Sequence, residues 1–360
     1  MPALAPVSGM SCHTHGDSTM PTFKVFAFDY GCAVGPALTR APAAQRQQGA
    51  LMLRALCADL RLLPDVELLT FDDVAARPAG LPFDRQFTQC VLAADAVWPL
   101  APVAGGILER LSGDVLRHRR ILLGSTPDAV RIAASKRSTC ATLQRAGVPT
   151  VATFSPGDSL PAGIGAWVAK PDDGAGCVDT RLFHDSGAAQ ASAAAQRGRE
   201  QVLQPFVAGR VGSLSLLCRD GVARVLGCNE LRMAVHDNQF RFLGSTVNGL
   251  ASLAPQLEVL AQAVAAALPG LWGYAGVDFI LAEGGALVLD VNPRLTVSYA
   301  GLHASTGINP AGAVLGLLQE TPAQPVVQQH SQAPLRSQPA QPTRAPALPV
   351  SVDVATFGLR

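Results

Sequence analysis

The sequence is short of lysine. Its 360 residues include 28 basic ones, of which only Lys24, Lys136 and Lys170 are lysines. Acidic residues nearly balance them and leave a formal net charge of +1, so the chain lacks the positive surplus that nucleic-acid binding and polybasic membrane binding require. In such an arginine-rich chain, each remaining lysine is a candidate for a role that a compact ammonium fills and a forked guanidinium does not.

The sequence also lacks a membrane span, a signal peptide and paired cysteines. No apolar run reaches the roughly 18 residues that cross a bilayer, and the first 20 residues lack the basic segment and apolar stretch of a secretory signal. The eight cysteines are scattered without a C-x-x-C pair, which favours free thiols in a reducing compartment. We therefore expect a cytoplasmic protein with neither a nucleic-acid nor a membrane partner; the composition is compatible with a homodimer.

Composition and hydrophobic pattern divide the chain into four regions. Residues 1–20 and the Pro- and Gln-rich residues 321–360 contain too few large apolar side chains to form a core, and we expect a disordered leader and a disordered tail. Strand-like and helix-like segments alternate over residues 21–125, which predicts a βαβ domain with a small parallel sheet. Residues 126–320 contain closely spaced strands of antiparallel character, which predicts an α+β unit.

Several local elements bear on the arguments below. Apolar runs predict strands at residues 22–28, 67–70 and 89–94, and the last ten residues of the tail regain apolar character. One helix is predicted over residues 128–146, with Thr126 as its N-cap and a glycine at its end.

Two aspartates and an asparagine are predicted to meet on one face of a β-hairpin. If residues 283–285 form a three-residue loop, Asp278 lies directly opposite Asp290, and period-two alternation places Asn292 on the same face. Like charges directly opposite each other destabilise a sheet unless a cation lies between them, and hard oxygen donors of this kind suit Mg²⁺. The alternative is that these residues form the solvent-facing polar side of an edge hairpin. That alternative would account for a single aspartate, but it accounts less well for three such residues in register.

Two of the three lysines precede this hairpin. Lys170 ends a predicted strand at residues 167–170 and runs into a loop that contains Gly174 and Gly176. Glycines let backbone N–H groups approach an anion, and a lysine is a point charge for phosphate. Lys136 lies in the preceding helix, where by itself it is equally a surface lysine. The chain contains neither a P-loop motif nor the paired protein-kinase motifs, which excludes both of these nucleotide sites.

Taken together, these segments resemble the ATP-grasp enzymes from roughly residue 120 to residue 318. The resemblance is carried by five segments in the expected order: Lys136, residues 147–149, residues 170–176, residues 204–209, and Asp278 with residues 290–294. A finer resemblance, to the tyramine–glutamate ligase family of methanofuran biosynthesis and its bacterial relatives in one-carbon metabolism, is carried by residues 122–127, 226–229 and 292–302. The chain departs from the pattern at Asp290, where a glutamate is commoner, and at Ser135, where an aspartate is expected.

The resemblance implies an ATP-grasp fold of mixed α/β and α+β class over residues 126–320, with two subdomains and the nucleotide between them, behind a pre-ATP-grasp-like domain at residues 21–125. It further implies a role for each matching residue. Lys136 and Lys170 would contact the α- and β-phosphates of ATP, and the loop that contains Asp173, Gly174, Ala175 and Gly176 would close over the phosphates. Gln204 and the backbone of Phe206 and Val207 would meet the adenine. Asp278, Asp290 and Asn292 would hold one or two Mg²⁺ or Mn²⁺ ions, and Arg294 and Lys170 would act in catalysis.

The activity implied is ATP-dependent joining of a small-molecule carboxylate to an amine through an acyl phosphate, with glutamate and tyramine or a similar amine as the substrate pair. Thr296, Ser298 and Tyr299 follow Arg294 on a loop over the same site, where they are either contacts to the acceptor substrate or an ordinary polar loop. Two alternatives stay open: an ATP-grasp peptide or amino-acid ligase with a different substrate pair, and an ATP-grasp module that binds nucleotide without catalysis.

Overall fold

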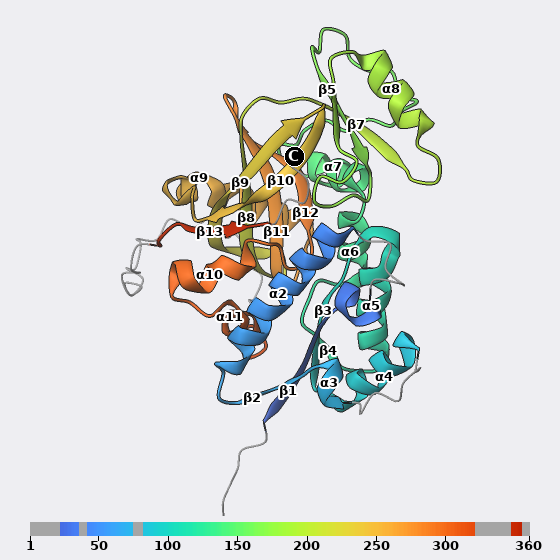
Figure 1. The fold of residues 1–360 in the computed structure, drawn as a ribbon. Coiled ribbons are helices and arrows are strands. Elements are labelled where there is room, and N and C mark those ends of the chain that lie inside the picture. The colour runs from blue at the N-terminus through green and yellow to red at the C-terminus, as the bar shows by residue number, and fades with distance from the viewer. Residues whose placement is uncertain (1–21, 36–41, 75–81, 321–346, 355–360) are drawn as a thin grey trace, which may run out of the picture.

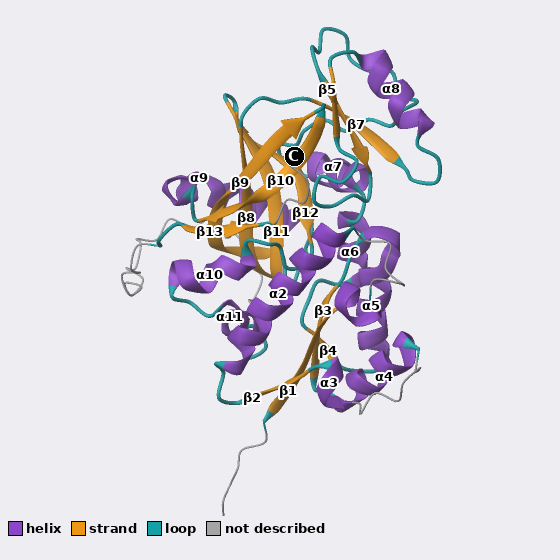
Figure 2. Ribbon diagram, viewed as in Figure 1, coloured by secondary structure: helices purple, strands orange, loops and turns teal. Residues whose placement is uncertain are grey.

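A computed structural model describes residues 22–35, 42–74, 82–320 and 347–354. In these ranges, a small parallel sheet and a large antiparallel sheet form the two ends of the molecule (Figures 1 and 2). No helix among the described residues is long and apolar enough to cross a membrane. The predicted leader at residues 1–20 and most of the predicted tail lie outside the described residues.

The N-terminal end is built on a four-stranded parallel sheet in the order β2-β1-β3-β4. The long helix α2 packs on one side of this sheet and buries Met52, Leu56 and Leu60 at helical spacing. The elements are β1 (Phe23–Asp29), α1 (Tyr30–Val34), α2 (Ala43–Arg61), β2 (Val66–Leu69), α3 (Phe71–Val74), α4 (Phe83–Ala93), β3 (Ala96–Leu100), α5 (Ile107–Arg117) and β4 (Ile121–Leu122).

The strand predicted at residues 89–94 is wrong. The segment belongs to α4, and the strand that follows it is β3. The short apolar run at this point fits a strand or a buried helix equally well. What distinguishes them is the burial of Phe87, Cys90, Val91 and Ala94, whose spacing of three, four and seven residues is that of one helical face.

The helix predicted over residues 128–146 is two helices, α6 (Pro127–Ala133) and α7 (Lys136–Arg145). Thr126 caps α6 by accepting a hydrogen bond from the Ala129 N–H, as predicted. The break occurs at Ser135, whose backbone is extended and whose hydroxyl caps α7 by accepting from the Ser138 N–H at 3.0 Å. A second helix start therefore places Lys136 at the first position of α7.

The rest of the chain forms a nine-stranded sheet in the order β12-β11-β8-β9-β10-β6-β5-β7, with β13 paired to β10. The part made of β5, β6, β7 and α8 has its own small core around Trp167 and Leu203. The elements are β5 (Trp167–Pro171), β6 (Arg181–Phe183), α8 (Ser186–Ala195), β7 (Gln201–Pro205), β8 (Arg210–Arg219), β9 (Val222–His236), β10 (Gln239–Val247), α9 (Ala254–Ala267), β11 (Gly273–Ala282), β12 (Gly285–Asn292), α10 (Tyr299–Thr306), α11 (Pro310–Gly316) and β13 (Val350–Asp353).

The predicted disorder of residues 321–360 is wrong for residues 350–353. They form β13, which pairs with residues 244–247 of β10, and Val352 is buried. The alternation of apolar Val350 and Val352 with polar Ser351 and Asp353 places one face of this short strand on the core.

One hydrophobic core joins the two sheets. It contains Leu56 of α2 and Trp98 of β3 from the N-terminal end, and Tyr274 of β11 and Leu302 of α10 from the large sheet. Figure 1 shows α2 lying alongside α10 and α11, and both helices contact it. The carboxyl ends of the parallel strands therefore lie against the large sheet, in a fixed relation to the hairpin β11–β12.

Candidate active site

The hairpin β11–β12 places Asp278 directly opposite Asp290, as predicted. The predicted loop length is wrong: Ala282 pairs with Gly285, so the loop has two residues rather than three. A β-bulge between Val288 and Asp290 leaves the residue between them unpaired, and this extra residue restores the register that the shorter loop would otherwise shift.

Asn292 completes the group on the same hairpin. Its side-chain N–H donates to Asp278 Oδ2 at 3.2 Å. Burial and the neighbouring Asp290 raise the pKa of Asp278 to about 7, because a carboxylate that has lost water beside another carboxylate is costly to ionise. A divalent cation between the two carboxylates would remove this repulsion, so the donor set fits Mg²⁺. No three His, Cys, Asp or Glu side chains of the described residues cluster as a metal site; these donors are two carboxylates and an amide.

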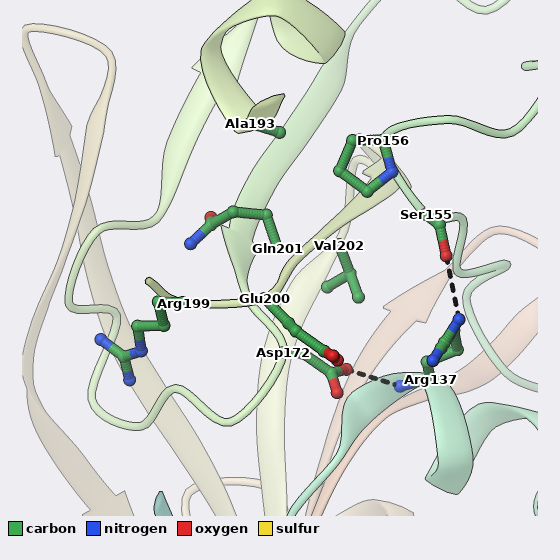
Figure 3. A pocket seen from close by; sticks show the side chains of 9 residues that line it. All are labelled: Arg137, Ser155, Pro156, Asp172, Ala193, Arg199, Glu200, Gln201 and Val202. Atoms are coloured by element: carbon green, nitrogen blue, oxygen red, sulfur yellow. Dashed lines mark hydrogen bonds between the residues drawn. The ribbon is translucent and has the colours of Figure 1, made fainter. Parts of the chain in front are cut away.

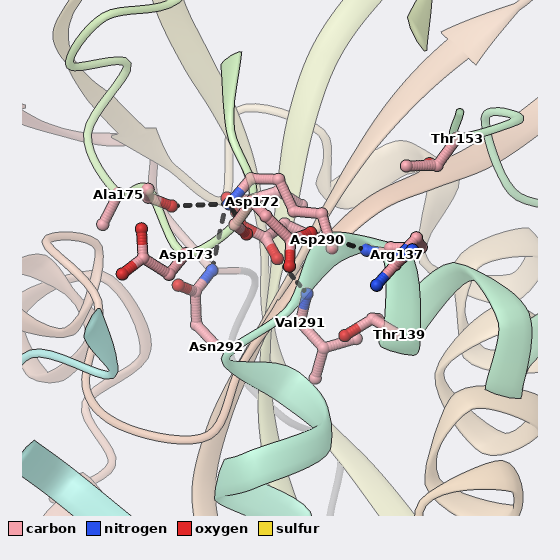
Figure 4. A network of polar contacts seen from close by, with 12 residues as sticks. Arg137, Thr139, Thr153, Asp172, Asp173, Ala175, Asp290, Val291 and Asn292 are labelled. Carbon is pink, nitrogen blue, oxygen red and sulfur yellow. Dashed lines mark hydrogen bonds and ion pairs between the residues drawn. The ribbon is translucent and has the colours of Figure 1, made fainter. Parts of the chain in front are cut away.

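Lys136 connects this hairpin to the glycine-containing loop. The side chain is 7% exposed, and its Nζ lies 3.2 Å from Asp290 Oδ2. The same Nζ donates to the carbonyl oxygens of Gly174 at 2.6 Å and Asp172 at 3.3 Å. A lysine at the first position of a helix opposes the helix dipole, so these acceptors help to compensate the charge of Lys136. Figure 4 shows Asp290 and Asn292 close to the loop residues Asp172, Asp173 and Ala175.

The loop itself is tied at both sides. Asp173 accepts from Arg199 Nε at 2.8 Å, and the Ala175 carbonyl accepts from the Gln45 side chain of α2 at 3.0 Å. Gly176 has a φ of +65°, which favours glycine. The loop thus bridges the β5–β7 part of the large sheet and the N-terminal end, over the position of Lys136.

Lys170 and Arg294 add two further cations to the same place. Burial and the nearby Lys136 lower the pKa of Lys170 to about 8. Burial also lowers the pKa of Arg294, while Asp29, Asp290 and Asp278 act in the opposite direction. Arg294 Nη1 donates to the adjacent Leu295 carbonyl at 2.9 Å, and its buried Nε has no hydrogen-bond partner. Three cations therefore lie near two opposed carboxylates, and one of the cations, Arg294, has a buried donor without a partner.

Asp29 is a residue that the sequence reasoning missed. It ends β1, caps α1 by accepting from the Cys32 N–H at 2.8 Å, and is buried. Burial raises the pKa of Asp29, while the nearby Arg294 has the opposite effect. The available signal was its position at the carboxyl end of the first parallel strand, where α/β sheets place their ligands.

The predicted adenine-contacting residues lie along β7 and the segment after it. Gln204 is buried and donates to Thr153 Oγ1 at 2.7 Å. The Phe206 N–H already donates to the Ala166 carbonyl, so the adenine contact, which stays a prediction, falls to the other backbone groups of Phe206 and Val207. The exposed Phe206 ring lies 6.4 Å from the ring of Phe240 on β10. These two rings from different parts of the sheet offer flat apolar faces of the kind on which a base stacks.

The three predicted substrate contacts are held by the protein. Ser298 and Tyr299 are buried, and they hydrogen-bond to Ser245 and to Asp59 of α2. Thr296 Oγ1 lies 2.8 Å from the Tyr274 hydroxyl. These contacts give all three residues a structural role, and their contact with substrate stays a prediction.

A cavity of about 320 Å³ lies beside this site rather than within it (Figure 3). Figure 3 shows Arg137, Asp172 and Glu200 gathered on one side of it. The Arg137 side chain donates to Ser155 and its backbone N–H to Asp172. Its lining contains none of the predicted nucleotide or metal residues.

Comparison with known protein families agrees with this geometry. Residues 133–298 match the ATP-grasp domain, and residues 55–130 match the pre ATP-grasp 3 domain. The chain therefore has the ATP-grasp fold behind a pre-ATP-grasp domain. A search of curated proteins finds no match.

Solved structures of the same fold are numerous. An ATP-grasp superfamily protein from Archaeoglobus fulgidus is 20% identical with a TM-score of 0.62, over 82% of this chain and 88% of that one. D-alanine–D-alanine ligase from Bacillus anthracis is 15% identical with a TM-score of 0.59, over 83% and 96% of the two chains. L-amino acid ligase from Bacillus licheniformis is 17% identical with a TM-score of 0.57, over 82% and 74%. At these identities, the likeness is one of fold.

Proposed function

We propose that the protein is an ATP-dependent ligase that joins a small-molecule carboxylate to an amine. The observation that carries the proposal is the convergence of Lys136, Lys170 and Arg294 on the opposed pair Asp278 and Asp290 in an ATP-grasp fold. Phosphoryl transfer needs positioning and charge neutralisation more than a side-chain nucleophile, and this site supplies cations without an activated serine or cysteine.

In the first step, a carboxylate oxygen of one substrate attacks the γ-phosphorus of ATP. The bond from that phosphorus to the β–γ bridging oxygen breaks, ADP leaves with the bond's electron pair, and an acyl phosphate forms. Lys136 and Lys170 hold the phosphates, and Arg294 stabilises the charge that develops on the transferring oxygens. Bound Mg²⁺ or Mn²⁺, held by Asp278, Asp290 and Asn292, would neutralise phosphate charge.

In the second step, the nitrogen of a neutral amine attacks the acyl carbonyl carbon. The carbon–oxygen bond to the phosphate breaks, inorganic phosphate leaves, and the nitrogen loses a proton to give the amide. An amine that arrives unprotonated needs no side-chain base, and we assign none. The closed glycine-containing loop would keep water from the acyl phosphate.

Glutamate with tyramine, or with a similar amine, is the substrate pair that we propose. It is supported by the sequence resemblance at residues 292–302, which span Arg294 and the first turn of α10. The names of two similar structures, D-alanine–D-alanine ligase and L-amino acid ligase, support an amino acid as the carboxylate donor.

The test is ADP release over panels of carboxylates and amines, with MgATP binding measured in parallel. We expect ADP release with glutamate plus tyramine, loss of it in Asp290→Asn, and full activity in the control Asp65→Asn, whose side chain is exposed. ADP release only with other pairs would overturn the substrate assignment. MgATP binding without ADP release from any pair would overturn the ligase and favour a non-catalytic module.

A further inference from the structure

Asp59, near the end of α2, is a buried carboxylate whose side-chain partners belong to α10. It is 5% exposed. The Tyr299 hydroxyl donates to its Oδ2 at 2.9 Å, and His303 Nδ1 lies 2.6 Å from its Oδ1. Because a carboxylate only accepts, His303 Nδ1 is the donor in the second contact. Asp59 thus holds two donors, one helical turn apart, on the same face of α10.

Tyr299 is the first residue of α10 and directly follows the loop that carries Arg294. The Tyr299 N–H donates to the Thr296 carbonyl at 3.0 Å. The Tyr299 ring packs edge-on against Tyr274 of β11 at 5.5 Å between centroids, and the Tyr274 hydroxyl lies 2.8 Å from Thr296 Oγ1. The residues between Arg294 and α10 are therefore fixed from two directions, by Tyr274 on one side and by the Tyr299–Asp59 contact on the other.

Close packing makes this loop sensitive to small shifts. A Cβ added at Gly276 would lie 2.5 Å from the Thr296 methyl group, so the loop sits directly on the backbone of β11. Arg294 depends on the same loop, because its described hydrogen bond goes to the neighbouring Leu295 carbonyl and its Nε has none. A displaced loop would carry the guanidinium with it.

We propose that Asp59 is a positioning residue of the N-terminal end, which sets the loop at residues 293–298 and through it the guanidinium of Arg294. The kinetic part of the proposal rests on the proposed function, and the structural part does not. An aspartate suits this role because its two oxygens accept from Tyr299 and His303 together. A leucine of similar size would leave the buried Tyr299 hydroxyl without an acceptor, which is more costly than losing the contact alone.

Hydrogen exchange tests the structural part without any substrate. In Asp59→Leu, the amides of Tyr299, Ala300 and Gly301, which bond to carbonyls of residues 296–298, should exchange about tenfold faster than in the wild type. Asp59→Asn keeps one acceptor and should show a smaller increase. The control is Asn309→Ala, which removes two hydrogen bonds of the α11 N-cap, one to the Asp59 backbone carbonyl at 2.8 Å and one from the Gly312 N–H at 3.0 Å, and should leave these amides unchanged.

Kinetics test the consequence for Arg294. In Asp59→Leu, the kcat for ADP release should fall about thirtyfold, a loss typical of a misplaced catalytic group, while the Kd for MgATP stays the same. In an Arg294→Lys background, Asp59→Leu should cost less than about a further twofold, because residues that act through one another are non-additive. Asp59→Asn should recover part of kcat. Should Asp59→Leu fail to fold, Tyr299→Phe takes its place in both experiments.

Three outcomes would overturn the proposal: unchanged exchange at residues 299–301, a lowered melting temperature with unchanged kcat, or additive losses with Arg294→Lys. If the wild type releases no ADP with any substrate pair, the proposed function fails. The exchange measurement then still decides whether Asp59 sets the loop.

Discussion

The affinity for MgATP should fall as the pH rises through about 8, because Lys170 loses its proton there. Burial and Lys136 lower the pKa of Lys170 from 10.5 to about 8 in the nucleotide-free protein. Only the ammonium form of Lys170 attracts phosphate, and a bound phosphate would raise the pKa of Lys170 again. Above pH 8, nucleotide binding therefore includes the free-energy cost of protonating Lys170, and this cost grows with pH. Between pH 7.5 and pH 9.0, the deprotonated fraction rises from about a quarter to about nine-tenths, and the Kd should rise about tenfold.

Calorimetric titration with a non-hydrolysable MgATP analogue measures this change directly. Asp278, with a pKa of about 7, is about a quarter protonated at pH 7.5 and almost fully ionised at pH 9.0, so its titration would change the affinity only about 1.3-fold, in the opposite direction. Lys170→Arg should bind more weakly at pH 7.5 but lose the pH dependence, because its guanidinium stays protonated. Lys24→Arg is the matched control, since Lys24 lies half exposed beside Glu67 and should reproduce the wild-type curve. An equally steep curve in Lys170→Arg, or a flat one in the wild type, would refute the reasoning.

Three further predictions concern single sites. Lys136→Arg should weaken MgATP binding about tenfold or more in the same titration. The lysine is 7% exposed and already contacts two carbonyls and Asp290, which leaves no room for the larger guanidinium of arginine. Unchanged affinity would contradict the phosphate role of Lys136. Asp290→Ala should reduce ADP release at least about a hundredfold while circular dichroism shows an intact fold; retained turnover would contradict the metal site. Gly276→Ala should lower the free energy of unfolding by about 1–3 kcal/mol in urea denaturation, because the added Cβ would lie 2.5 Å from the Thr296 side chain. Wild-type stability of this variant would show that the loop at residues 293–298 can move without cost.

The part of the site that the sequence predicts depends on local pattern. Period-two alternation places Asp278 opposite Asp290, and the capping preference of threonine locates the start of α6. Ser135 carries the same capping signal, followed three residues on by the amide that it binds. The apolar pattern continues across the break, so the sequence predicts one helix where the structure has two.

The parts that the sequence does not predict depend on contacts between distant segments. The proximity of Asp29 to Arg294, and the contact of Asp59 with Tyr299, arise only when the parallel sheet packs against the large one. The docking of β13 on β10 joins residues about a hundred positions apart. A pattern in one segment carries no information about such a partner, so these contacts emerge from the fold alone.

The bulge in β12 has a consequence for how this hairpin tolerates change. A residue gained or lost in the turn alters the pairing of everything beyond it, unless a second change of opposite sign lies in the same strand. The unpaired residue before Asp290 is such a compensating change. A turn that is shorter by one residue, together with one extra residue in β12, leaves the number of residues between the two aspartates unchanged, so both carboxylates still face each other.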